Sequence, residues 1–143
     1  DNPMGSWHPG TVIEAMLDRI PDGALLVLDE AYAEFAPDDA IPQIEAGDPR
    51  VIRLRTFSKA YGMAGARIGY AIGAAPLIAG FDRIRNHFGV NKIAQAGALA
   101  ALADRDWLAH IRAEVAGARA RILGIHHHKE EPHDNYGHDK HGK

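Results

Sequence analysis

The run Leu25–Leu28 places four apolar residues in a row, and Asp29 follows them directly. This is the length of a short strand, and an apolar run without alternation is typical of a strand buried on both faces. Such strands form the parallel sheets of α/β proteins, in which helices cover both sides. Ligands bind at the carboxyl ends of strands in open sheets, so Asp29 is expected to be partly buried there, beside a cationic or hydrogen-bonding partner. A helix cap or a plain loop residue is the alternative role for Asp29.

The other residues up to 125 alternate between helix and strand patterns. Helices are predicted over residues 11–20, 76–86 and 92–103 and from 105 onward, strands over residues 51–55 and 68–73, and a loop over residues 36–49. Thr11 and Glu14 have the spacing of a capping box, and Asn91 and Asp104 are expected to cap the last two helices. Strands that alternate with helices predict a layered α/β fold.

Composition narrows the classes of protein to which this chain can belong. The 143 residues suffice for one domain or part of one, and a net charge of -3 excludes the basic footprint of a nucleic-acid-binding domain. No cysteine is present, which excludes disulfides, thiolate metal sites and cysteine nucleophiles. No apolar run approaches the roughly 20 residues that span a bilayer, and no signal peptide is recognisable. We expect a cytoplasmic protein, and a first residue other than Met suggests a start within a longer chain.

Residues 126–143 differ sharply in composition from those before them. They contain six of the nine histidines and a single hydrophobic residue, Tyr136. So little apolar surface cannot offset the entropy lost on ordering, so this segment is predicted to be a disordered His-rich tail. Imidazoles bind zinc, copper or nickel, which leaves a metal-binding tail as an alternative. The spacing of the histidines defines no single closed site, and no metal site is predicted.

Residues 56–69 carry most of the candidate chemistry. The segment follows a predicted strand and holds Thr56, Ser58, Lys59, Arg67 and three glycines. Hydroxyls and a guanidinium suit a phosphate, glycines let the backbone approach a ligand, and a lysine can form a Schiff base with an aldehyde. A phosphate site beside a reactive lysine indicates pyridoxal phosphate. A flexible, solvated Gly/Lys loop is the alternative, whereas the Walker and dinucleotide-binding glycine patterns are absent.

Three motifs, in this order, resemble the fold-type I, pyridoxal-phosphate-dependent aminotransferases of classes I and II. They are Asn-Pro-Met-Gly at residues 2–5, Asp-Glu-Ala-Tyr-Ala-Glu-Phe at residues 29–35, and Thr-Phe-Ser-Lys at residues 56–59 with Arg67 eight residues after the lysine. Within these classes the sequence is most similar to histidinol-phosphate aminotransferases. The resemblance implies part of the family's large domain over residues 1–125, a mainly parallel sheet with flanking helices, followed by the tail.

The resemblance also implies a role for each matched residue. Lys59 would form the Schiff base with pyridoxal phosphate and then move the proton between the amino acid's α-carbon and the cofactor's C4′. Asp29 would keep the pyridine nitrogen protonated, and Asn2 and Tyr32 would hydrogen-bond the phenolic oxygen. The phosphate ligands would be Thr56, Ser58 and Arg67. Lys59, Asp29 and Tyr32 are thus the expected catalytic residues.

The implied reaction is reversible amino transfer between an L-amino acid, glutamate, and a keto acceptor. Histidinol phosphate and imidazole-acetol phosphate are the leading pair, with an aromatic-amino-acid aminotransferase or a threonine-phosphate decarboxylase as alternatives. Residues 85–91 depart from the family pattern, which makes His87 a candidate substrate contact or a plain surface group. Family members are homodimers, so we expect the parent protein to dimerise. The ring-stacking aromatic residue and the substrate-carboxylate arginine lie outside the chain, so the chain alone is expected to be an inactive fragment.

Overall fold

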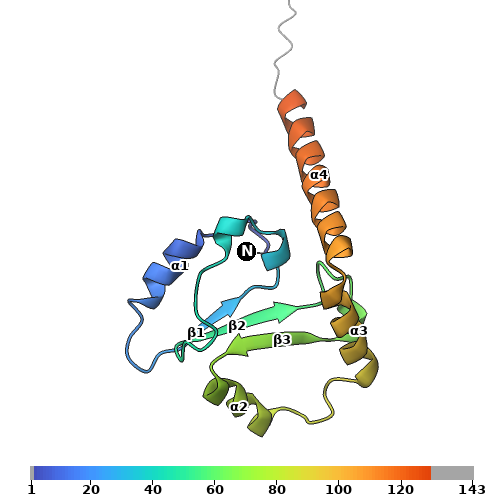
Figure 1. Cartoon of the computed structure of the whole chain (residues 1–143). Helices are drawn as coiled ribbons and strands as arrows, with labels where there is room; N and C mark the ends of the chain where they lie inside the picture. The colour runs from blue at the N-terminus through green and yellow to red at the C-terminus, as the bar shows by residue number, and fades with distance from the viewer. Residues whose placement is uncertain (1, 130–143) are drawn as a thin grey trace, which may run out of the picture.

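The computed structural model describes residues 2–129 and has a mixed α/β fold (Figure 1). The elements are α1 (Gly10–Leu17), β1 (Leu26–Asp29), β2 (Val51–Thr56), β3 (Gly69–Gly73), α2 (Ala75–Ile84), α3 (Lys92–Ala103) and α4 (Arg105–Lys129), with the short 3-10 turns η1 (Ala33–Phe35), η2 (Asp38–Ala40) and η3 (Ala64–Ala66). The predicted α/β class is confirmed.

The three strands form one sheet in the order β1-β2-β3. β1 is parallel to β2, with Leu26 opposite Val51 and Asp29 opposite Leu54. β3 is antiparallel to β2, so this described part of the sheet is mixed rather than mainly parallel. The reason is that only a loop connects β2 to β3, and a parallel neighbour would need a longer crossover. The carboxyl ends of β1 and β2 therefore lie at the same edge of the sheet.

The expected burial of the first strand on both faces is wrong for this structure. Val27 is 55% exposed, Leu25 is 42% exposed, and Asp29 is also exposed. β1 is an edge strand of the described sheet, and the main helix contacts lie elsewhere, α1 against η2, α2 against β3 and α4 against η1. The buried side chains instead gather around β2 and its neighbours: Leu17, Val51, Ile52, Phe57, Ala60, Ala74, Ala94 and Ala98.

Helix ends agree with the sequence where a side chain caps the backbone. Asn91 Oδ1 accepts a hydrogen bond from the Ala94 N–H at 2.7 Å, and Asp104 Oδ1 accepts one from the Trp107 N–H at 2.9 Å. Both predicted caps are thereby confirmed, because each satisfies a free N–H of the first helical turn. The helix predicted to reach about residue 86 ends at Ile84, with Pro76 in its first turn.

The capping box predicted for the first helix is not formed. Pro9 is the N-cap of α1 and no side chain caps the helix. Glu14 Oε1 instead accepts a hydrogen bond from the backbone N–H of Gln43 at 2.6 Å. A contact with a distant loop thus replaces the local one, and α1 ends at Leu17, three residues before the predicted end.

Helix α4 continues to Lys129, so the predicted domain boundary at residue 125 does not coincide with a helix end. Figure 1 shows this helix projecting away from the sheet. Residues 126–129 are assigned to this helix, and the rest of the predicted tail, residues 130–143, lies outside the described residues. Within residues 2–129, none of the helices is long and apolar enough to cross a membrane.

Candidate functional site

The loop after β2 lies beside the end of β1, because the two strands are parallel and end at the same edge. A cavity of about 370 Å³ opens there. Its lining includes five of the residues singled out in the sequence, namely Asp29, Thr56, Ser58, Lys59 and Arg67. An acid, an amine, two hydroxyls and a guanidinium thus surround one space, although they are spread over 39 positions of sequence.

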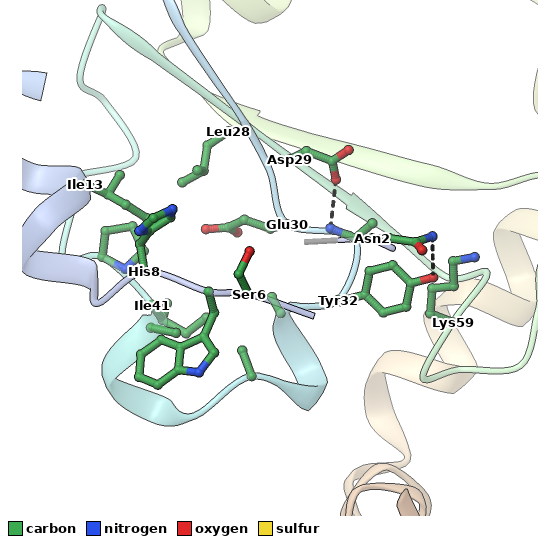
Figure 2. A pocket seen from close by; sticks show the side chains of 16 residues that line it. Asn2, Ser6, His8, Ile13, Leu28, Asp29, Glu30, Tyr32, Ile41 and Lys59 are labelled. Carbon is green, nitrogen blue, oxygen red and sulfur yellow. Dashed lines mark hydrogen bonds between the residues drawn. The ribbon is translucent and has the colours of Figure 1, made fainter. Parts of the chain in front are cut away.

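A larger cavity of about 610 Å³ adjoins the first one. Asp29 and Lys59 line both cavities, and Asn2 and Tyr32 line the larger one. Figure 2 shows Asn2, Tyr32 and Lys59 close together at one side of this cavity. All seven predicted site residues therefore border the two adjoining cavities, and their chemical roles stay predictions.

Tyr32 contacts both of its neighbours in the larger cavity. Lys59 Nζ lies 5.2 Å from the centroid of the Tyr32 ring, within the range of a cation–π contact. The Asn2 amide Nδ2 donates a hydrogen bond to the Tyr32 hydroxyl at 3.4 Å. The hydroxyl of Tyr32 thus contacts the N-terminal turn, and its ring contacts the lysine loop.

Asp29 is oriented by the backbone that follows it. Its Oδ1 atom accepts a hydrogen bond from the Ala31 N–H at 3.0 Å (Figure 2). The expectation that Asp29 is partly buried is wrong, since the residue is exposed at the end of an edge strand. This exposure leaves the carboxylate accessible from the cavity.

The lysine loop is anchored by Phe57, whose side chain is buried. Its ring packs against Tyr61 and Tyr70, with centroids 5.1 and 5.6 Å away. Its backbone N–H donates to Ile68 O, and its carbonyl accepts from the Met63 N–H. The loop therefore closes on itself around Phe57, which brings residues 56–58 near Arg67.

The polar side chains of this loop are held by local backbone geometry. Thr56 Oγ1 accepts a hydrogen bond from the Ser58 N–H at 3.1 Å. Arg67 has left-handed backbone angles, φ 53° and ψ 53°, and its Nη1 donates to Ala64 O at 2.8 Å. A non-glycine residue in this conformation is uncommon and is a feature of functional loops.

A buried charge cluster that was not predicted borders the site, since Glu30 lines the larger cavity and Arg55 lines the smaller one. Glu30 and Glu34 are 7% and 8% exposed. Glu30 Oε1 accepts from Arg53 Nε at 2.9 Å and Nη2 at 2.7 Å, and Glu30 Oε2 accepts from Arg55 Nε at 2.8 Å. Glu34 Oε1 lies 3.6 Å from Arg55 Nη1 and has no hydrogen-bond partner among the described residues.

The charges of this cluster shift the pKa of its neighbours. Burial alone lowers the pKa of Arg55, but the hydrogen bond and the charge of Glu30 outweigh it, so the pKa is raised. Burial raises the pKa of Tyr61, and the charge of Glu34 adds to that effect. Both groups therefore keep their ordinary charge at neutral pH.

Comparison with known proteins places this chain in a family. The family model described as Aminotransferase class I and II matches residues 1–128. The chain belongs to this family. The match includes the three motifs and every residue that lines the two cavities.

Relatives of this aminotransferase-family chain include histidinol-phosphate aminotransferases and aromatic amino acid aminotransferases. Histidinol-phosphate aminotransferase 1 from Mesorhizobium japonicum is 45% identical over 129 residues, which cover 87% of this chain and 35% of the relative. An aromatic amino acid aminotransferase from Nocardia farcinica is 42% identical over 127 residues, 85% of this chain and 36% of the relative. The chain thus spans about a third of the length of these relatives.

A solved structure of the family has the same fold. Histidinol-phosphate aminotransferase from Sinorhizobium meliloti, in complex with pyridoxal-5'-phosphate, superposes with a TM-score of 0.81 at 54% identity. The alignment covers 85% of this chain and 34% of that one.

The histidines of this aminotransferase-family chain were candidates for a substrate contact and for metal ligands. His87 is exposed in the turn after α2 and lines neither cavity. Within residues 2–124, whose side chains the structure describes, His, Asp and Glu form no group of three that could hold a metal ion. The six histidines from 126 onward lie outside that range.

A sequence signal for the buried cluster did exist. Arg53 and Arg55 stand two residues apart in a predicted strand, which places both on one face, and Glu30 directly follows the first strand. Two cations on one face of a strand need anions nearby, and the parallel pairing brings Glu30 to that face.

Proposed function

We propose that this chain is the cofactor-binding part of a pyridoxal-phosphate-dependent aminotransferase. The observation that carries the proposal is the cavity that Asp29, Lys59, Thr56, Ser58 and Arg67 line together. Membership of the aminotransferase class I and II family supports it, as does the pyridoxal-5'-phosphate complex of the Sinorhizobium meliloti relative.

The side chains in the cavity match two functional ends of this cofactor, the phosphate group and the ring nitrogen. Thr56, Ser58 and Arg67 would hold the phosphate, because hydroxyls and a guanidinium are good phosphate ligands. The exposed carboxylate of Asp29 would accept a hydrogen bond from the protonated ring nitrogen. This nitrogen is the cationic partner that the sequence predicts for Asp29. Pyridoxal phosphate, when bound, supplies an electron sink for the carbanion that forms at an amino acid's α-carbon.

Three residues of the larger cavity complete the proposed chemistry. Lys59 would attach the cofactor's aldehyde carbon and, once released by substrate, carry the proton to and from the substrate α-carbon. Asn2 and Tyr32 would hydrogen-bond the ring's phenolic oxygen, next to the lysine that Tyr32 already contacts.

The substrate pair that we propose is histidinol phosphate and imidazole-acetol phosphate. Glutamate would be the amino donor that converts imidazole-acetol phosphate to histidinol phosphate. The Mesorhizobium japonicum and Sinorhizobium meliloti relatives support it. Aromatic amino acids are the second candidate, because the Nocardia farcinica relative is nearly as similar to the chain. A cytoplasmic homodimer, as the resemblance implies, is part of the proposal for the parent protein.

Reductive labelling of the 143-residue chain tests the proposed attachment site. The chain is incubated with pyridoxal phosphate, reduced with borohydride and digested, and the pyridoxyl group is located by mass spectrometry. We expect the label on Lys59, and its loss in Lys59→Ala. Labelling of Lys92 at the same level, or no label above that of Lys59→Ala, would overturn the proposal.

A further inference from the structure

Glu30 occupies the position directly after Asp29; its side chain is buried, and it lines the larger cavity together with Asp29 (Figure 2). Side chains alternate along a strand, and Asp29 is paired with Leu54 while Leu28 is paired with Arg53. Asp29 and Leu54 therefore share one face of the sheet, and Glu30 lies with Arg53 toward the other, although Asp29 and Glu30 both line the larger cavity. The Glu30 N–H donates to Leu54 O at 2.9 Å, which extends the ladder by one residue beyond β1.

The arginines that bind Glu30 lie on β2 just before the lysine loop. Arg55 directly precedes Thr56, and Arg53 is two residues earlier. Glu30 contacts both of them, with three nitrogen–oxygen distances between 2.7 and 2.9 Å. One carboxylate thus connects the residue after Asp29 to the residue before Thr56.

We infer that Glu30 is a positioning residue, which fixes the distance between Asp29 and the phosphate ligands by joining the end of β1 to Arg53 and Arg55. The inference rests on the proposed function, because that distance matters only to a ligand that contacts both ends. Such a ligand is a pyridine ring that carries a phosphate group, held by Asp29 at the nitrogen and by Thr56 and Ser58 at the phosphate.

A buried ion cluster contributes more to geometry than to stability. Charges lose hydration on burial, so replacing a buried ion pair by apolar residues is often neutral for stability. Strong, directional hydrogen bonds between an arginine fork and a carboxylate nevertheless hold two backbone segments at one separation. β1 needs such a restraint, because it is a four-residue edge strand with exposed apolar side chains. A binding site keeps its geometry only where supporting contacts hold it.

The test compares how Glu30→Gln changes the affinity for the whole cofactor and for one of its ends. Pyridoxal phosphate binding to the 143-residue chain is measured by absorbance titration, and inorganic phosphate binding by NMR titration. We expect Glu30→Gln to bind pyridoxal phosphate about tenfold more weakly, the size typical of lost supporting contacts, with phosphate affinity unchanged. Unchanged pyridoxal phosphate affinity, or a parallel loss of phosphate affinity, would overturn the inference.

Two further variants separate positioning from stability. Glu30→Gln leaves the two arginines with one carboxylate, Glu34, so the double variant with Arg53→Gln restores the charge balance and is expected to stay folded. The double variant is expected to show the same selective loss for pyridoxal phosphate. Leu17→Ala removes a buried side chain that lines neither cavity and is expected to lower the unfolding temperature without changing either affinity. If Leu17→Ala weakened pyridoxal phosphate binding as much as Glu30→Gln does, stability alone would explain the effect.

The experiment also distinguishes this inference from the proposed function. If the unmodified chain binds pyridoxal phosphate and labels at Lys59 while Glu30→Gln binds equally well, only the inference fails. If the unmodified chain does not bind pyridoxal phosphate, both fail.

Discussion

The ammonium nitrogen of Lys59 lies 5.2 Å from the centroid of the Tyr32 ring. The hydroxyl of the same ring accepts a hydrogen bond from Asn2, so one side chain contacts two segments that are 57 residues apart in sequence. Tyr32 is therefore positioned to affect the lysine through its ring and the N-terminal turn through its hydroxyl.

Substitutions of Tyr32 should separate these two contacts. Tyr32→Phe keeps the ring and loses a hydrogen bond of about 0.5–1.5 kcal/mol, so we expect pyridoxal phosphate affinity to fall about two- to tenfold. Tyr32→Leu also removes the cation–π contact and should bind still more weakly. Absorbance titration measures both affinities, with Tyr61→Phe as a control outside the cavities. Equal affinity for all three variants would contradict the proposed role of Tyr32.

Asp29→Asn should weaken pyridoxal phosphate binding by about tenfold or more, because a hydrogen bond to a charged group contributes about 1.5–3 kcal/mol. The amide cannot supply the negative charge that a protonated ring nitrogen requires. The same titration measures the loss. Asp39→Asn, at an exposed residue outside the cavities, makes the same change in net charge and should bind like the unmodified chain. A similar loss in both variants would point to net charge rather than to contact.

Glu14 and Thr11 provide a paired test of how α1 is held. Glu14→Ala removes the 2.6 Å hydrogen bond to Gln43 and should lower the free energy of unfolding by about 0.5–1.5 kcal/mol. Thr11→Ala should have little effect, because no side chain caps this helix. Urea denaturation compares them. A larger loss in Thr11→Ala would show that a capping box forms in solution.

Gly69, the first residue of β3, is closely packed against β2. A Cβ atom there would lie 2.7 Å from the Arg55 carbonyl oxygen, so the backbone would have to shift. We expect Gly69→Ala to lower the free energy of unfolding by about 1–3 kcal/mol, as overpacking does. Gly80→Ala is the control, since nothing lies within 4 Å of its added Cβ, and it should stabilise α2 by up to about 1 kcal/mol. Denaturation curves that rank the two variants in the reverse order would contradict the packing argument.

Asp48 should make the chain slightly less stable in acid. Its hydrogen bonds with Arg50 lower the pKa of the Asp48 carboxyl in the folded state. The stabilisation is therefore present above the ordinary aspartate pKa of about 3.9 and is lost as the pH falls through the lower, folded value. Asp48→Asn should remove this small pH-dependent contribution to stability. The free energy of unfolding, measured between pH 5 and pH 3, should then fall less steeply with decreasing pH than in the unmodified chain. An identical slope in Asp48→Asn would show that the pair contributes nothing.

Much of the candidate site could be predicted from local sequence. Lys59 stands between hydroxyls and glycines, and Asp29 follows an apolar run, so both were expected at the carboxyl ends of strands. The parallel pairing of β1 and β2 confirms that placement. Glu30 was not predicted, because its burial depends on Arg53 and Arg55, which are more than twenty positions away.

The sequence by itself determined the strand at 51–55, the caps at Asn91 and Asp104 and the α/β class, because these depend on residues within a few positions of one another. Tertiary structure alone decided that β3 is antiparallel, that β1 is exposed and that Glu14 binds Gln43 rather than the start of its own helix. It also decided that one carboxylate joins the ends of β1 and β2. The physical reason is that burial and charge pairing depend on which distant segments meet, and local patterns carry no information about that meeting.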